Sequence, residues 1–246
     1  MKFNRTDILE IGKNNKILKI NIRLKNFLFQ GRMQEKTVLD SYIRNKKINR
    51  KIFIMCGEEI YIKKLTIPNL NGEILEKAIK DELKFYYRVS EEIVFSYNIL
   101  KKNKNNIDLM IFYINSERLN KFDIKKLYNV KAIYMVQFLY IQYINKIIDY
   151  KNYLLAFIHD KYIYLIYCQD KMLKANVVIE NFNANEIELK KHILNFCNSN
   201  NISSSLMEKL ILVGLNLDEI KSLDMEYDIK NLGYLEKSQI YGPLGT

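Results

Sequence analysis

Residues 51–100 carry, in strict order, two apolar runs of strand length, an amphipathic helix and a further strand. Ile52–Met55 and Ile60–Leu65 are rich in β-branched residues and flank a short polar gap that contains Gly57. A glycine in such a gap predicts the turn of a β-hairpin. Pro68–Gly72 then ends the second strand, because proline lacks the ladder donor and asparagine and glycine favour turns.

A helix is predicted to begin at Glu73, since acidic residues stabilise the first turn of a helix. Its apolar residues recur at steps of three and four, which places them on one face: Leu75, Ala78, Ile79, Leu83 and Tyr86. Ile93–Leu100 alternates in the manner of a half-buried strand. The stretch therefore predicts a unit of strand, strand, helix and strand.

Hairpins and helices alternate along the rest of the chain. Before residue 51, the patterns predict a hairpin of Ile8–Ile11 with Lys16–Leu24, a strand at Asn26–Arg32 and a helix at Glu35–Arg44. After residue 100, they predict strands at Ile107–Ile114, Val130–Met135, Leu173–Ile179 and Leu210–Val213, a hairpin of Leu154–Ile158 with Tyr162–Tyr167, and helices at Ser116–Leu127, Phe138–Ile148 and Asn185–Asn198. This order indicates an α/β fold with mixed sheets.

Composition limits the class of protein. A chain of 246 residues with 48% apolar residues can bury a large core, in one large domain or two small ones. No apolar run reaches the roughly 20 residues that span a bilayer, and Met1–Asp7 lacks the features of a signal peptide. The three cysteines, Cys56, Cys168 and Cys197, are far apart and odd in number, which favours a reducing compartment. We expect a cytoplasmic protein.

The formal net charge of +11 raises the question of a nucleic-acid or anionic-membrane partner. Only 7 of the 39 basic residues are arginines, whereas bidentate recognition of phosphate favours arginine. The densest basic runs, Arg44–Lys51 and Lys101–Lys104, are diluted with asparagine. The pattern favours a solvated basic surface, and binding of nucleic acid stays open as an alternative.

Several motifs along the chain resemble the PilM family of type IV pilus assembly proteins. That family shows a strand ending in a leucine–proline pair, a helix with a glutamate ahead of a tyrosine-containing turn, and a glutamate pair before the next strand. The matching residues here are Leu65–Pro68, Leu70, Glu73–Leu75, Ile79, Glu82, Phe85–Tyr87, Glu91–Val94 and Tyr97. Leu210–Gly214 resembles the strand that leads to the family's adenosine-side glycine. The cytoplasmic domain of type II secretion GspL proteins is related and similar at this level.

The resemblance implies an actin-like fold, that is, a ribonuclease H-like unit that is duplicated. Residues 1–49 would form the first part of subdomain 1, residues 50–130 an inserted partner-binding module with a strand–helix–strand core, and residues 131–246 the remainder of subdomain 1 with a reduced subdomain 2. It also implies a cytoplasmic scaffold at the inner face of the cytoplasmic membrane, in a type IV pilus or type II secretion-like complex. Its partners would be the cytoplasmic tail of a PilN-like membrane protein and the motor ATPase.

Actin-like ATPases hold phosphates in two hairpin turns, each with an acidic residue and a glycine, and the first of these turns is only partly kept here. Glu10 replaces the usual aspartate and Gly12 keeps the glycine, while Lys16 lies one place from the position of the family's phosphate lysine. We expect Glu10, Gly12, Lys16 and Gly214 to mark a vestigial nucleotide site.

In the second turn the acid and glycine positions are held by Phe157 and His159. The loss of glycine removes the close backbone approach that a phosphate requires. These changes predict a pseudo-ATPase without catalytic residues and without a cofactor. An active ATPase that binds ATP and magnesium is the alternative.

Partner binding is expected in a groove between the first subdomain and the inserted module, either by addition of a strand to an exposed sheet edge or by side chains seated in pockets. The expected groove residues are Tyr61, Leu65, Ile67, Phe85 and Tyr86. Phe85 and Tyr86 are adjacent, so the two rings cannot both face the core of one helix. The spacing of the cysteines and histidines predicts no metal site. His159 and Asp160 are expected in a solvated turn, and His192 in a surface pair with Glu188.

Overall fold

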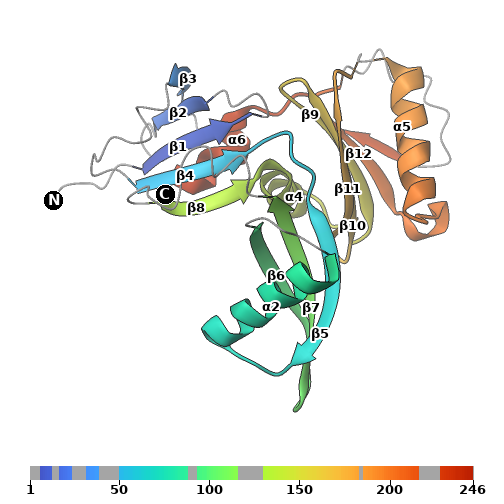
Figure 1. The fold of residues 1–246 in the computed structure, drawn as a ribbon. Coiled ribbons are helices and arrows are strands. Elements are labelled where there is room, and N and C mark those ends of the chain that lie inside the picture. Colours follow the sequence, from blue (N-terminus) through green and yellow to red (C-terminus); the bar gives the residue numbers. More distant parts are fainter. Residues whose placement is uncertain are drawn as a thin grey trace. The chain divides into compact units, whose positions relative to one another are not determined.

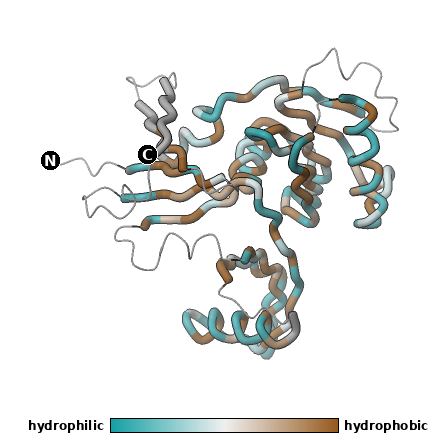
Figure 2. The backbone as a smooth tube through the Cα atoms, turned by 45° about the horizontal axis from the view of Figure 1, so that its top comes forward, coloured by the Kyte–Doolittle hydropathy of each residue, from teal (hydrophilic) through white to brown (hydrophobic). Residues whose placement is uncertain are grey.

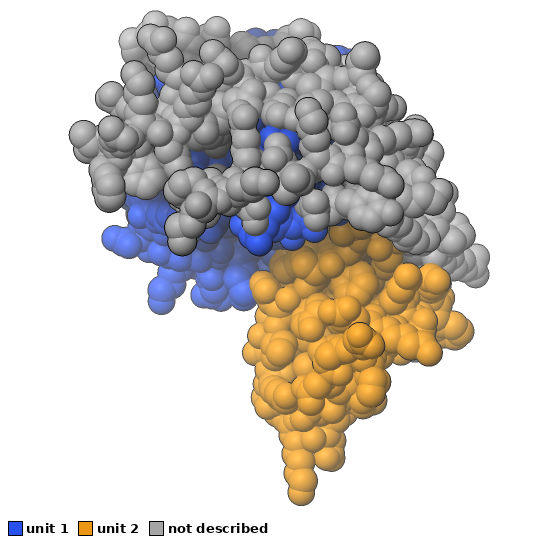
Figure 3. All heavy atoms as spheres, turned by 90° about the vertical axis from the view of Figure 1, so that its left-hand side faces the viewer, with its two compact units in different colours: residues 1–58, 127–246 blue, residues 59–126 orange. Residues whose placement is uncertain are grey.

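The computed structural model describes residues 6–12, 17–23, 32–38, 50–87, 93–115, 130–182, 185–215 and 228–245. The chain forms two compact units (Figure 3). One unit comprises Met1–Glu58 together with Leu127–Thr246, and the other comprises Glu59–Lys126. Within the described residues, no helix is both long and apolar enough to cross a membrane.

The first unit contains two five-stranded sheets with the same strand order (Figure 1). The first sheet has the order β3-β2-β1-β4-β8, from β1 (Thr6–Ile11), β2 (Ile17–Arg23), β3 (Arg32–Val38), β4 (Arg50–Met55) and β8 (Val130–Met135). The second has the order β11-β10-β9-β12-β13, from β9 (Tyr153–His159), β10 (Tyr162–Gln169), β11 (Met172–Glu180), β12 (Lys209–Val213) and β13 (Ile229–Asn231).

Strand direction repeats as well. In each sheet the first three strands form an antiparallel meander, and two further strands run parallel on the other side of the first strand. Equal order and equal direction in both sheets mean that the unit is a duplication. The predicted α/β fold with mixed sheets is confirmed.

Burial explains why the central strands are apolar throughout. Ile52–Met55 on β4 and Leu210–Val213 on β12 are all buried, as expected for strands with a neighbour on each side and cover on both faces. The hydropathy of the backbone trace shows these strands as hydrophobic stretches (Figure 2). Such strands read as unbroken apolar runs in the sequence, without the alternation of a surface sheet.

The helices of the first unit are α4 (Val136–Ile147), α5 (Glu186–Ser199) and α6 (Lys237–Tyr241), with the 3₁₀ helices η2 (Ser204–Leu206) and η4 (Gly242–Gly245). Helix α5 begins at a cap in which the Asn185 side chain accepts from the backbone N–H of Glu188. Its apolar face packs on the second sheet through Leu189, Ile193 and Phe196.

The second unit is a small layered module of β5 (Tyr61–Pro68), α2 (Gly72–Tyr87), β6 (Ile93–Lys102) and β7 (Asn106–Asn115). Its antiparallel sheet has the order β5-β7-β6. The predicted apolar face of α2 packs on alternate residues of the central strand: Leu75, Ile79 and Leu83 share a core with Ile107, Leu109 and Ile111. This period-two pattern on β7 fixes the register of the strand, because a slip of one residue would turn the core side chains away from α2, to the other face of the sheet.

The hairpin predicted between Ile52–Met55 and Ile60–Leu65 is wrong. Strand β4 pairs with β1 and β8 in the first unit, whereas β5 pairs with β7 in the module. The polar gap with Gly57 is the passage from one unit to the other, whose boundary lies between Glu58 and Glu59. The module therefore begins after β4, which belongs to the duplicated part of the chain.

The helix predicted at Glu35–Arg44 is wrong in its first four residues, because Glu35–Val38 belongs to β3 and pairs with β2. The apolar residues in this short segment fit the side-chain period of a helix as well as that of a strand. Pairing with β2 makes the segment a strand. Three predicted segments lie outside the described residues: the rest of that helix, the strand predicted at Asn26–Arg32 apart from Arg32, and the whole of the helix predicted at Ser116–Leu127.

Candidate functional site

Two polar residues lie near the ends of corresponding strands in the two halves of the duplicated unit. Glu10 lies next to the end of β1 and His159 ends β9, and each of these strands is the first of its sheet. Both side chains are almost fully buried, at 1% and 3% exposure. Unpartnered polar groups are costly in such a place, so the partners of these two side chains define the site.

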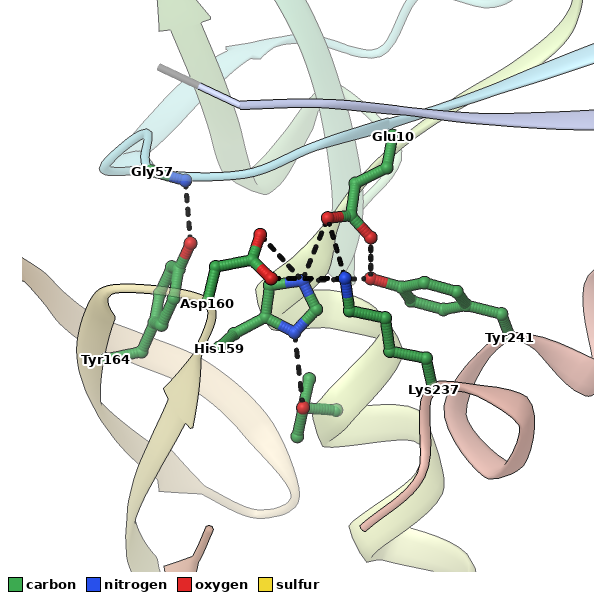
Figure 4. Close-up of polar contacts among 8 residues, drawn as sticks. Glu10, Gly57, His159, Asp160, Tyr164, Lys237 and Tyr241 are labelled. Atoms are coloured by element: carbon green, nitrogen blue, oxygen red, sulfur yellow. Dashed lines mark hydrogen bonds and ion pairs between the residues drawn. The ribbon is translucent and has the colours of Figure 1, made fainter. Parts of the chain in front are cut away.

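The Glu10 carboxylate is held on both oxygens (Figure 4). Oε1 lies 3.4 Å from His159 Nε2 and accepts from Lys237 Nζ at 3.1 Å. Oε2 accepts from the Tyr241 hydroxyl at 2.9 Å. On the opposite side of the imidazole, His159 Nδ1 lies 3.3 Å from the Tyr140 hydroxyl. The Tyr241 hydroxyl also lies 3.1 Å from His159 Nε2, so both ring nitrogens have a hydroxyl partner.

These contacts set the ionisation of the carboxyl. Burial alone would raise the pKa of Glu10, but the hydrogen bond and charge of His159, the Lys237 ammonium and the Tyr241 hydroxyl together hold the pKa well below its ordinary value. Burial also raises the pKa of Tyr241 and of Tyr140, so both remain hydroxyl donors at neutral pH. The cluster is a buried anion surrounded by its own donors.

The C-terminal segment supplies two of those donors because of its local structure. Helix α6 begins with a capping box in which Glu236 and Gln239 exchange hydrogen bonds with each other's backbone. Lys237 and Tyr241 are four residues apart on this helix, so they share a face. Lys237 Nζ also reaches Asp160 in the β9–β10 turn, at 3.1 Å from Oδ1. One lysine thus links the ends of both hairpins.

An aromatic stack lies beside the cluster. Phe157 on β9 is fully buried between Tyr140 of α4 and Tyr164 of β10, with ring centroids 3.8 Å and 4.5 Å away. The Tyr164 hydroxyl accepts from the backbone N–H of Gly57 at 2.6 Å. The position at which the resemblance would place the second acidic residue is therefore part of the hydrophobic core.

The prediction of a solvated turn is wrong for His159, which is buried, and it fits Asp160 better, whose side chain is 39% exposed. The sequence holds a signal that could have found the cluster: His159 ends an unbroken apolar run, where a solvated residue is unexpected. The predicted surface pair on α5 is confirmed, with His192 Nε2 3.5 Å from Glu188 Oε1.

The other residues of the expected nucleotide site are only partly described. Gly12 is half-buried after β1, and Lys16 lies outside the described residues. Gly214 has a positive φ of 75°, and its N–H donates to the carbonyl of Gly233 at 2.8 Å. The backbone of Gly214 is thus committed to a contact within the chain.

The predicted partner-binding residues are distributed between surface and core of the module. Tyr61 is 53% exposed and stacks on Tyr113, and Phe85 is 77% exposed. Leu65 is half-buried against the core, whereas Ile67 is a buried core residue and is not available to a partner. The side chain of Tyr86 lies outside the described part.

One set of donor atoms in the described residues has the composition of a metal site. A Glu10 carboxylate oxygen, the Cys56 sulfur and a His159 ring nitrogen lie within 4.8 Å of one another, and all three residues are buried. Spacing along the sequence does not predict this set, because its members come from three strands or strand ends that are far apart along the chain.

Comparison with known proteins identifies the fold. No family model matches the sequence, and no curated protein matches it. Among solved structures, the PilM–PilN type IV pilus biogenesis complex superposes with a TM-score of 0.59 at 12% identity, over 96% of this chain and 94% of the other.

Two further structures are similar over nearly their whole length. The cytoplasmic domain of EpsL, an inner-membrane component of the type II secretion system of Vibrio cholerae, has a TM-score of 0.54 at 10% identity, covering 97% of this chain and 93% of that one. A Bacteroides thetaiotaomicron protein with an actin-like ATPase fold and unknown function has a TM-score of 0.52 at 15% identity, covering 96% and 92%. The duplicated sheets and these superpositions together establish that the chain has the actin-like fold, the fold of the PilM and EpsL structures.

Proposed function

We propose that this chain is a cytoplasmic scaffold of an inner-membrane assembly complex of the type IV pilus or type II secretion kind. It binds the cytoplasmic tail of a PilN-like membrane protein, contacts the motor ATPase and does not hydrolyse ATP. The likeness to the PilM–PilN complex and to the EpsL domain, over nearly the full chain, supports the scaffold role. In this role the protein lies at the inner face of the membrane through its partners.

The single observation that supports the absence of hydrolysis is the internal neutralisation of Glu10. The carboxylate that would direct magnesium toward a bound phosphate already has donors on both oxygens. Magnesium requires near-ideal octahedral ligation by oxygen and loses its waters reluctantly. Displacement of these donors by magnesium would therefore cost free energy. At the acid position of the second turn, Phe157 stands in place of a carboxylate, and its ring is stacked on Tyr140.

A thermal-shift experiment with the full chain tests the nucleotide part. ATP with magnesium at millimolar concentration should leave the melting temperature unchanged, because a ligand stabilises only a state that it binds. A rise in melting temperature that Glu10→Ala abolishes would show an active nucleotide site and would overturn this part of the proposal.

The partner surface is proposed on the module, where Tyr61 and Phe85 present large rings to solvent. Rings of this kind are the residues that dominate binding energy when a partner covers them. Leu65 and Tyr86 are proposed to flank this surface, whereas Ile67 lies in the core and does not contribute to it.

Binding of the full chain to tail peptides of membrane proteins encoded beside its gene tests the scaffold role. Tyr61→Ser and Phe85→Ser should each weaken binding roughly 5- to 30-fold, the usual effect of truncating an interface ring. Tyr234→Ser is the matched control, since Tyr234 is 78% exposed in the other unit. Equal binding by all three variants would exclude this surface, and no binding by any neighbouring tail would exclude the scaffold role.

A further inference from the structure

We infer that Glu10, Cys56 and His159 form a binding site for a transition-metal ion of the zinc class. The three donors are a carboxylate oxygen, a thiol sulfur and an imidazole nitrogen, and they lie within 4.8 Å of one another. Zinc, a borderline-soft ion, accepts this mixture of sulfur, nitrogen and oxygen ligands. Tetrahedral ligation with bond lengths of about 2.3 Å to sulfur and about 2.0–2.1 Å to nitrogen places two donors roughly 3.5 Å apart, so donors farther apart than this move inward when the ion binds.

The surroundings have the features of a metal site. A histidine ligand is commonly fixed by a hydrogen bond at its other ring nitrogen, and His159 Nδ1 has the Tyr140 hydroxyl at 3.3 Å. A ligating carboxylate is commonly held in turn, and Glu10 Oε2 accepts from Tyr241 at 2.9 Å. Cys56 follows β4 directly, and its backbone N–H donates to the carbonyl of Ile11 at the end of β1, which fixes the thiol beside Glu10.

Lys237 is the competing cation at this place. Its ammonium lies 3.1 Å from Glu10 Oε1, so a metal ion on this oxygen displaces it. Asp160 offers the alternative position, because its Oδ1 already lies 3.1 Å from the same ammonium and its side chain is 39% exposed. The lysine therefore keeps an ion pair when the metal binds.

The charges of the cluster balance both without and with the metal ion. This balance is needed because an uncompensated charge in a buried site is costly in free energy. Without metal, the Glu10 carboxylate faces the Lys237 ammonium. With metal, the carboxylate and the Cys56 thiolate together neutralise the doubly charged ion, His159 binds as the neutral ring, and Lys237 pairs with Asp160. Binding releases the thiol proton to solvent, and no electron transfer is involved.

Cobalt(II) titration of the chelator-treated full chain tests the site, because a cobalt–thiolate bond gives a charge-transfer absorption in the near ultraviolet. The wild type should show this absorption and should lose it when zinc is added. Cys56→Ser should abolish it and weaken zinc affinity by at least about 100-fold, more than loss of an outer hydrogen bond costs. Cys197→Ser on α5 is the matched control, since that buried cysteine lies in a different core and should leave the absorption intact.

The variant Lys237→Gln provides a second test of the zinc site, which does not depend on loss of a ligand. It removes the competing cation while Tyr241 and His159 still hold Glu10, so zinc affinity should rise about tenfold, the scale of one nearby charge at a partly buried site. Absence of the thiolate absorption in the wild type, its persistence in Cys56→Ser, or unchanged affinity in Lys237→Gln would each overturn the inference. None of these results bears on tail binding or on the nucleotide test.

Discussion

Glu10, near the end of β1, and His159, at the end of β9, come from corresponding strands in the two halves of the duplicated fold, and their side chains meet, with Nε2 3.4 Å from Oε1. In an actin-like nucleotide site, the ends of these two hairpins face a ligand. Here the side chains of Glu10 and His159 face each other, and the C-terminal helix α6 supplies Lys237 and Tyr241 to complete the cluster.

The substitution Glu10→Gln should destabilise the protein by about 1–3 kcal/mol, because Lys237, Tyr241 and His159 lose their charged acceptor while Lys237 keeps its ion pair with Asp160. Urea unfolding of the full chain measures this change. Glu188→Gln is the control, since its pair with His192 lies on the surface of α5. It should change stability by less than about 0.5 kcal/mol. Equal effects of the two variants would mean that the cluster does not contribute to stability.

Stability should fall at acid pH through the same carboxyl. The folded pKa of Glu10 is held below its ordinary value of 4.5, so its contribution is fully present above about pH 4.5 and is lost as the pH falls toward the folded pKa. The difference in unfolding free energy between wild type and Glu10→Gln should shrink below pH 4.5, by up to about 1.4 kcal/mol per pH unit. Urea titrations at several pH values measure it, and a difference that stays constant into this range would contradict the buried, ionised Glu10.

The aromatic stack should be a strong contributor to stability. Phe157→Ala removes a fully buried ring that has a stacked neighbour on each face, so we expect a loss of about 3–5 kcal/mol. Tyr234→Ala, at a ring that is 78% exposed, should lie within about 0.5 kcal/mol of the wild type. Chemical denaturation compares the two, and a small effect of Phe157→Ala would mean that the stack is not formed in solution.

Two glycines should respond in opposite directions to alanine. Gly214 has φ +75°, and an added Cβ would lie 3.4 Å from the carbonyl oxygen of Ile158, so Gly214→Ala should cost about 1–2 kcal/mol. Gly242 is helical, at φ −48°, and has open space at the Cβ position. Gly242→Ala should be neutral or stabilise by up to about 1 kcal/mol. Melting temperatures of the two variants test the difference in sign.

Local patterns in the sequence were sufficient for most of the fold. Alternation and helical spacing predicted the β1–β2 and β9–β10 hairpins, α2, α4, α5 and the buried strand β12, because each is defined by its own side-chain period. Pairing between distant segments was not accessible in this way. Ile52–Met55 looks like half of a hairpin with the next strand, yet it pairs with β1 and β8, since burial of both faces outweighs closeness in sequence.

Of the residues in the buried cluster, only Glu10 was predicted from the sequence as a site residue. The sequence could suggest that Glu10 lies in a phosphate-binding turn, but it could not show that Lys237, 227 positions away, donates to the same carboxylate. Nor did it show the burial of His159, because a histidine beside an aspartate in a short turn is usually solvated. Both facts depend on contacts between the two halves of the duplication, which no local period encodes.

The insertion of the module between β4 and β8 has a consequence for the folding pathway. These strands are parallel neighbours, with Met55 opposite Met135, and such a pair normally needs only a short helical crossover. Here the crossover contains an entire folded unit, Glu59–Lys126. If the module forms first from its local contacts, the loop that must close before β4 meets β8 is shortened, and its entropic cost falls. Substitutions in the module core, such as Leu83→Ala, should therefore slow the formation of the first sheet, although they lie in the other unit.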